Sequence, residues 1–204
     1  MNDLADRARR LRSLTPSCGP VRLIAVDGHA GSGKSTFADR LAEALGGAPV
    51  LRLDDLASHE ELFAWTDRLR AQVLDPLSRG ASARYAPYDW TARRFGTPKT
   101  LAPAPVMLVE GVGAGRAAVR PFLAGLLWIE GDRGASWEQG RLRDGPGLAE
   151  FWDGWTLAEQ RHFADDPSYP FADTVIRRTP TGYAWLEGPR ATAGTSRIIT
   201  ESEG

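Results

Sequence analysis

Apolar residues follow two patterns that alternate along the chain. Short runs rich in leucine and β-branched residues, bounded by glycine, proline or aspartate, predict buried strands. Longer stretches with apolar residues every three or four positions predict amphipathic helices. Five strands are predicted, over residues 21–27, 48–53, 106–111, 125–130 and 171–176. Strands that alternate with helices predict an α/β fold, with three α/β/α layers and a mostly parallel five-stranded sheet.

The segments between these strands have apolar residues at helical spacing. The first strand is followed by a helix that ends at Gly46-Gly47, because paired glycines are a frequent stop signal. Residues after 180 are expected to add a strand or a hairpin. The other predicted helices cover residues 3–14, 60–78, 116–123 and 148–163, and we expect the last of these to pack on the sheet.

A glycine-rich segment lies between the first strand and its helix. It matches the pattern Gly, four residues, Gly-Lys-Ser/Thr, and it has the strand before and the helix after that this motif requires. Small residues let successive N–H groups point inward, and the helix adds its positive end, so a polyphosphate fits there. The predicted phosphate-binding residues are Gly28, His29, Ala30, Gly31, Ser32, Gly33, Lys34, Ser35 and Thr36.

Three residues indicate that the bound ligand is ATP with Mg²⁺. Two of them lie in this loop, and the third lies at the end of another strand. Lys34 is a compact cation for the β and γ oxygens, and the Ser35 hydroxyl is the usual ligand of the bridging Mg²⁺. The strand over 106–111 ends in Glu110-Gly111. A carboxylate at this position typically holds Mg²⁺ through water or orients the attacking group. We therefore place Ser35 and Glu110 at the metal.

Asp54 and Asp55 end the second predicted strand. Open α/β sheets bind their ligands at this edge, so one of the two carboxylates is a candidate general base. Aspartate is also a favoured residue at the start of a helix, and a capping role is the alternative. We choose Asp54 for the chemistry.

Arginines in the glycine-punctuated segment 131–147 predict a small lid. Phosphoryl transfer requires cations near the transferred group and the exclusion of water, and a mobile arginine-bearing segment provides both. Arg141 and Arg143 are the candidates for closing over the phosphoryl group. The alternative is that these are surface arginines on a short helix.

Arginines and aromatic residues interleave over residues 84–95. This mixture suits stacking on a planar base and pairing with phosphate, and it would also suit single-stranded nucleic acid. A third interpretation is a small β-hairpin whose aromatic side chains pack on one another. We treat residues 84–100 as an insertion at the substrate site.

Composition limits the remaining possibilities. The chain has 204 residues, which fits one domain, with 25 basic against 26 acidic residues. This balance argues against nucleic acid as the main partner and favours a small anion. Cys18 is the single cysteine, and no apolar run approaches a membrane span, so a cytoplasmic protein is expected. Within the single domain, 1–204, we assign residues 1–18 to the N-terminal helix, 84–100 to the insertion, 131–147 to the lid and 180–204 to the tail.

These pieces together resemble the uridine kinase group of P-loop nucleoside kinases, and more closely its compact members of uncertain substrate. The resemblance extends from about residue 21 to residue 176 and implies a P-loop NTPase fold. It implies that Asp54 takes the proton from a nucleoside 5′-hydroxyl. Glu110-Gly111, Arg143-Asp144 and Ala172-Asp173 also match the family. The family's base-binding segment corresponds to Tyr88-Asp89-Trp90 with Arg93, which makes Tyr88, Asp89 and Arg93 the predicted acceptor-binding residues.

Departures from the family pattern fall on the acceptor side. Leu56-Ala57 stands where the family has Phe-Tyr, and Arg93 stands in place of a histidine. Gly140 replaces a lid arginine, which leaves Arg141 as the possible substitute. The ATP half of the site is therefore matched, whereas the acceptor half is altered.

The sequence predicts ATP-dependent phosphoryl transfer to a hydroxyl of a small molecule, with a nucleoside as the leading acceptor. The alternative function is a nucleotide-binding regulatory ATPase module without a small-molecule acceptor. Nucleic-acid binding through residues 84–95 ranks last because the overall charge is neutral. Neither the acceptor nor the oligomeric state follows from the sequence.

Overall fold

Six strands form one sheet in the computed structural model, which describes residues 3–190. Five of them run parallel, as predicted, and the sixth is antiparallel at one edge. The prediction of five strands was one short, because the segment after residue 180 forms a hairpin with its neighbour. The order across the sheet is β10 (Gly182–Glu187), β9 (Thr174–Thr179), β8 (Gly125–Ile129), β1 (Arg22–Asp27), β7 (Val106–Glu110) and β2 (Val50–Arg52).

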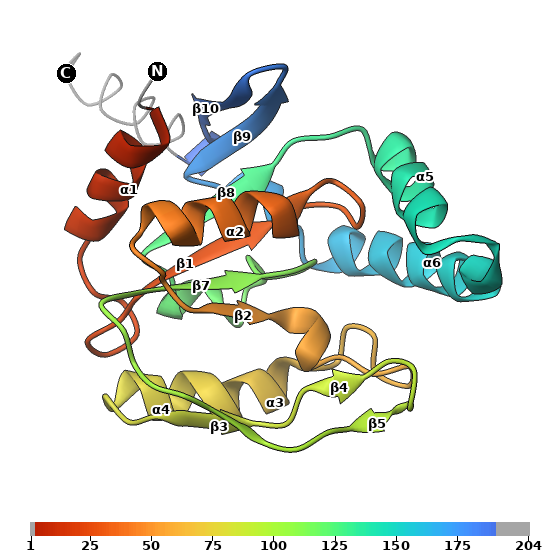
Figure 1. Cartoon of the computed structure of the whole chain (residues 1–204), viewed down its shortest axis with the longest axis horizontal. Helices are drawn as coiled ribbons and strands as arrows, with labels where there is room; N and C mark the ends of the chain where they lie inside the picture. Colours follow the sequence, from red (N-terminus) through yellow and green to blue (C-terminus); the bar gives the residue numbers. More distant parts are fainter. Residues whose placement is uncertain (1–2, 191–204) are drawn as a thin grey trace, which may run out of the picture.

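Helices cover both faces of the sheet, as Figure 1 shows. Successive side chains of β1 point to opposite faces, so Ile24 and Val26 join one core cluster while Leu23 and Ala25 join the other. The predicted three α/β/α layers are therefore present. One face is covered by α1 (Asp3–Ser13) and α2 (Lys34–Ala44), and the other by α3 (Thr66–Leu69), the π-helical turn η2 (Arg70–Leu74) and α4 (Asp75–Ser78).

Two predicted helices are shorter in the structure than the periodicity indicated. The helix predicted over 60–78 begins only at Thr66, because Ser58 and Glu61 close a turn through their backbone groups and the Ser58 hydroxyl. The helix predicted over 116–123 is reduced to the 3-10 helix η3 (Arg120–Phe122). Its first residues are instead tied to Asp166, whose carboxylate accepts the Ala117 N–H at 2.9 Å.

The predicted insertion at 84–100 consists of two small antiparallel pairs. The outer pair joins β3 (Ala83–Tyr85) to β6 (Lys99–Leu101), and the inner pair joins β4 (Tyr88–Asp89) to β5 (Arg94–Phe95). Tyr88 and Phe95 pack edge to face across the inner pair, with ring centroids 5.1 Å apart. The hairpin interpretation of this segment is therefore confirmed, and it places Trp90 at the tip.

Two further helices, α5 (Arg133–Asp144) and α6 (Ala149–Asp165), lie beyond the carboxyl ends of the parallel strands (Figure 1). The prediction that the second of these packs on the sheet holds only near its C-terminal end, where Phe163 contacts Trp128 of β8 with ring centroids 5.4 Å apart. Trp152 and Trp155 are buried in a separate cluster with Val112, over the glycine-rich loop. Within the described residues, no helix is long and apolar enough to cross a membrane.

Candidate functional site

The loop between β1 and α2 has the backbone that its glycines predict. Gly31 and Gly33 adopt φ values of +80° and +89°, which side chains other than glycine rarely accept. Helix α5 also packs directly on this loop. A Cβ on Gly31 would lie 1.9 Å from the carbonyl oxygen of Ser136 in α5. Both the local turn and the close approach of α5 therefore require glycine at position 31.

A cavity of about 490 Å³ opens beside this loop. Its floor comes from α2, its far side from the 3-10 helix η1 (Leu53–Asp55) and the end of β7, and its outer wall from α5 and α6. The parallel topology brings these elements together, because the ends of neighbouring strands meet at one edge. Seven residues predicted from the sequence line the cavity, namely Ala30, Gly31, Lys34, Ser35, Asp54, Glu110 and Arg143.

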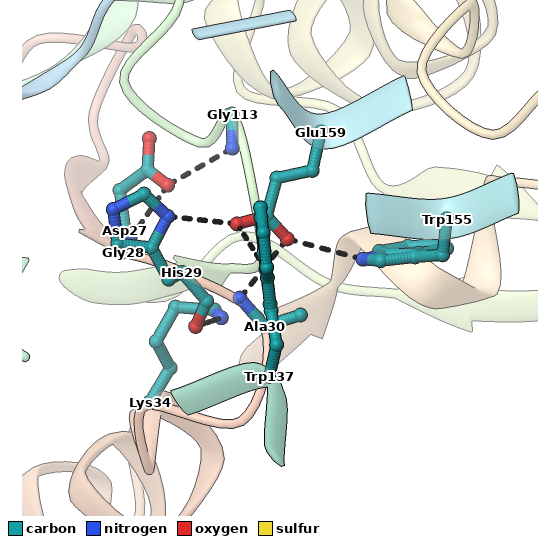
Figure 2. A network of polar contacts seen from close by, with 9 residues as sticks. All are labelled: Asp27, Gly28, His29, Ala30, Lys34, Gly113, Trp137, Trp155 and Glu159. Atoms are coloured by element: carbon teal, nitrogen blue, oxygen red, sulfur yellow. Dashed lines mark hydrogen bonds and ion pairs between the residues drawn. The ribbon is translucent and has the colours of Figure 1, made fainter. Parts of the chain in front are cut away.

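Lys34 is almost fully buried and is turned toward its own loop. Its Nζ donates to the carbonyl oxygen of His29 at 2.9 Å, as Figure 2 shows. The ammonium group is thereby held at the cavity wall. Its charge acts on both carboxylates of the cavity, since it lowers the pKa of Asp54 and that of Glu110.

The two carboxylates nevertheless both have raised pKa values. Enclosure by the protein raises the pKa of Asp54 most, although the side chain itself is open to the cavity, and the Asp55 charge adds to this. Lys34 and Arg143 act in the opposite direction. Burial also raises the pKa of Glu110, and the nearby Asp54 charge adds to it. Two carboxylates in one small cavity repel each other when both are charged. This repulsion favours binding of a proton or a cation there.

Arg52 was not predicted but holds one of these acids in place. Its Nη1 donates to Glu110 Oε2 at 3.0 Å, while its Nη2 donates to Asp39 at 2.7 Å. Arg52 lies on β2, directly opposite Glu110 in the register with β7. The pairing follows from strand register, which the sequence alone did not supply.

The residues at the cavity fit Mg²⁺. The Ser35 hydroxyl and Glu110 are both hard oxygen donors at its wall. No group of three or more metal-ligating side chains occurs among residues 3–190. Mg²⁺ in phosphoryl-transfer sites uses only one or two protein oxygens together with phosphates and water, so a sparse donor set is what this chemistry requires.

Nine predicted residues do not line the cavity: five belong to the glycine-rich loop itself (Gly28, His29, Ser32, Gly33 and Thr36), and four lie elsewhere. Arg141 donates to Asp153 on α6 at 2.7 Å, outside it. The Tyr88 hydroxyl lies 2.9 Å from His59 Nδ1. The other two lie at the end of β4 and in the hairpin turn that follows it. Asp89 accepts from the Thr91 and Ala92 amides, and Arg93 lies 3.9 Å from Glu60. Their roles stay predictions, and the hairpin contributes Trp90 and Thr91 to the wall instead.

The cavity has an aromatic lining, although Leu56-Ala57 stands where the uridine kinase group has Phe-Tyr. Leu56 and Ala57 are buried in the core and do not line the cavity. Aromatic rings reach the cavity from the hairpin tip and from α6. The sequence signal was present in the spacing of the α6 aromatics, but we interpreted it as packing on the sheet. The aromatic lining consists of His59, Trp90, Phe151, Trp152 and Trp155.

Glu159 is a buried carboxylate that joins α6 to the phosphate-binding loop (Figure 2). Its Oε2 accepts the Ala30 N–H and the Trp155 indole N–H, both at 3.1 Å. Its Oε1 accepts the Trp137 indole N–H at 3.1 Å and lies 2.7 Å from His29 Nδ1. Burial opposes the charge, but these hydrogen bonds and Lys34 outweigh it and lower the pKa of Glu159. A single glutamate in a helix carries no sequence signal of this role.

Asp27 fixes the start of the same loop. It is fully buried at the end of β1, and its carboxylate accepts the N–H groups of Gly28, Gly113 and Gly115 at 2.7, 2.9 and 2.8 Å. Burial raises its pKa, against the hydrogen bonds that lower it. The loop after β1 is thus tied to the loop after β7.

Comparison with known proteins identifies the fold. No model of a protein family matches the chain, and no curated protein matches its sequence. Solved structures do match. A possible uridine kinase from Bacillus stearothermophilus is 17% identical, with a TM-score of 0.57 over 85% of this chain and 97% of that chain. A putative fructose transport system kinase from Silicibacter sp. is 18% identical, with a TM-score of 0.51 over 81% and 89%.

The chain therefore has the fold of the P-loop kinases, and the predicted resemblance to uridine-kinase-like structures is confirmed at the level of fold. At such low identity the likeness establishes the fold alone.

Proposed function

We propose that this protein transfers the γ-phosphoryl group of ATP to a hydroxyl group of a small molecule. One observation carries the proposal. Lys34 and Ser35 of the phosphate-binding loop line the same cavity as two acids, Asp54 and Glu110, from neighbouring strand ends. This is the set of groups that holding a triphosphate and accepting a proton requires. The two kinases with similar structures support the same class of reaction.

Each residue then has a distinct task. The loop amides and Lys34 hold the β and γ phosphates and neutralise their charge. Asp54 orients the acceptor hydroxyl and takes its proton as the oxygen bonds to the γ phosphorus and the bond to ADP breaks. Arg143, whose charge reaches Asp54, lies at the cavity wall to stabilise negative charge on the transferred group.

The metal contributes charge neutralisation. When bound, Mg²⁺ would be held by Ser35 and Glu110 and would offset charge on the phosphate oxygens. Arg52 keeps the Glu110 carboxylate oriented through its 3.0 Å hydrogen bond. A nucleoside is the acceptor that the sequence resemblance suggests.

Lys34→Ala tests the phosphate site. We expect kcat/KM for ATP to fall at least about 100-fold, because a charge that stabilises the transferring group is lost. The measurement is acceptor-dependent ADP release with a panel of alcohols, nucleosides and sugars. Lys99→Ala is the matched control, since Lys99 is exposed and lies outside the cavity.

Two results would contradict the proposal. One is equal turnover by the Lys34→Ala variant and the parent. The other is ADP release that no acceptor increases, which would favour the regulatory ATPase module. Calorimetry with ATP and Mg²⁺ gives an independent check, because a phosphate site must bind the nucleotide whether or not an acceptor is known.

A further inference from the structure

One wall of the cavity, away from the phosphate-binding loop, is built mainly from aromatic and aliphatic side chains. Trp90 at the hairpin tip faces Phe151 and Trp155 of α6, and Leu148 extends the same wall. The ring centroids of Trp90 and Phe151 are 5.6 Å apart, and those of Trp90 and Trp155 are 6.4 Å apart. These pairs meet at 74° and 69°, so the rings form a wall of edges and faces and not a parallel slot for a flat base.

The polar atoms of these rings are already paired within the protein. The indole N–H of Trp90 donates to the Asp54 carbonyl oxygen at 3.2 Å. Those of Trp152 and Trp155 donate to Asp144 and Glu159, each at 3.1 Å. All three tryptophans therefore present only carbon and π surface to a ligand.

Other polar groups at this end are also occupied. Both oxygens of Asp144 accept from Arg143, at 2.6 and 3.0 Å. His59 uses Nδ1 with the Tyr88 hydroxyl at 2.9 Å. Within residues 3–190, the side-chain groups left for an acceptor here are the Thr91 hydroxyl, the second ring nitrogen of His59, the Asp54 carboxylate and the Nη1 group of Arg143. The proposed function assigns that Arg143 group to the transferred phosphoryl group.

We infer that the acceptor is an alcohol with an aromatic or aliphatic body and few polar groups besides the hydroxyl that is phosphorylated. This rests on the proposed function and names its substrate class. A pyrimidine base or a sugar would leave behind hydrogen bonds to water that this wall does not replace. The apolar part of such an alcohol has no hydrogen bonds to water to lose, and it buries its surface against the rings. The hydroxyl group of the alcohol then lies next to Asp54.

Binding is measured first, with 2-phenylethanol as the probe, in the presence of Mg²⁺ and a non-hydrolysable ATP analogue. Uridine, gluconate and choline are the competitors for nucleoside, polyol and cationic acceptors. Tryptophan fluorescence and calorimetry both report on the cavity. We expect 2-phenylethanol to bind at least about tenfold more tightly than each competitor. Tighter binding of any competitor, choline included, would overturn the inference.

Leu148→Gln adds a polar group to the apolar wall without emptying the core, since Leu148 is half exposed. We expect its kcat/KM for 2-phenylethanol to fall about tenfold while KM for ATP stays unchanged. The matched control is Leu157→Gln on the exposed part of α6, which lies outside the cavity and should leave both constants unchanged. Equal behaviour of the two variants would count against an acceptor on this wall.

Failure of this inference differs from failure of the proposed function. Phosphorylation of uridine or gluconate in preference to the probe would refute the apolar acceptor and leave the kinase intact. Absence of ATP binding would refute the kinase itself.

Discussion

Asp54 and Asp55 are neighbours in the chain but have different surroundings. Asp54 lines the cavity, whereas Asp55 accepts the Tyr85 hydroxyl at 3.3 Å and lies 3.9 Å from Lys99. Burial and the Asp55 charge raise the pKa of Tyr85 to about 12. Asp55 therefore has a structural partner, while Asp54 is open to the cavity.

Asp54→Asn is predicted to lower kcat by about 10² to 10⁴-fold, the usual contribution of a positioned general base. Asp55→Asn is the control and should stay within a few-fold of the parent. The base works only when deprotonated, so the parent's rate should fall as pH drops through the raised pKa of Asp54, at a pH above the ordinary value of 3.8. A pH–rate profile checks this, and an unchanged acid limb in Asp54→Asn would refute the assignment.

At the scale of elements, α6 and the phosphate-binding loop are linked through Glu159. The carboxylate reaches the loop at Ala30 and His29, and it reaches α5 through Trp137 (Figure 2). The helices over the cavity and the loop under it therefore share one buried hydrogen-bonded group. A change in the position of either helix must also move the loop's backbone or break these bonds.

Glu159→Gln is predicted to weaken this link. An amide has one acceptor oxygen, so its NH₂ group would face an indole or backbone N–H, at a cost of about 1–3 kcal/mol. We expect a lower unfolding midpoint in urea and a KM for ATP that rises more than kcat falls. Glu150→Gln, in the exposed first turn of α6, is the control. A variant with parental stability and KM would show that the link does not position the loop.

At the scale of the whole molecule, stability is predicted to depend on pH through His162. Burial, followed by the charge of Arg116, lowers its pKa from 6.5 to about 4. The ring stacks on Phe63 at 5.1 Å, and its Nδ1 lies 3.3 Å from Arg116 Nη2. The folded protein therefore disfavours the charged imidazole.

The sign of this dependence follows from proton binding. Between pH 6.5 and about 4 the unfolded chain binds the proton and the folded chain does not, so stability is full above pH 6.5 and is lost as pH falls toward 4. Urea denaturation from pH 7.5 to 4.5 measures the slope. For His162→Gln, the free energy of unfolding should change less steeply with pH over this window, even if the variant is less stable at pH 7.5. A parental slope in the variant would mean that other groups cause it.

Much of this molecule could be predicted because the signals are local. The alternation in β1, the glycine motif and the acids at strand ends each lie within a few consecutive residues. Parallel topology then brings the ends of β1, β2 and β7 to one edge, and so Lys34, Asp54 and Glu110 to one cavity. Arg143 also reaches it, whereas Arg141 pairs with Asp153 instead.

What the sequence missed are contacts between distant segments. Glu159 is separated from Ala30 by more than half of the chain, and Arg52 meets Glu110 only through strand register. The helix of residues 149–165 has the spacing of any amphipathic helix, and nothing local distinguishes packing on a sheet from packing over a loop. The aromatic lining of the cavity depends on where this helix packs.

By itself, the sequence determined the α/β layers and the glycine-rich loop between β1 and α2, because hydrophobic periodicity and backbone freedom at glycine are properties of adjacent residues. The tertiary structure alone decided where α6 packs and which rings line the cavity. These features depend on the burial of apolar surface between segments that are far apart in the chain. Several arrangements satisfy the same local pattern, and the packing of the complete fold determines which one forms.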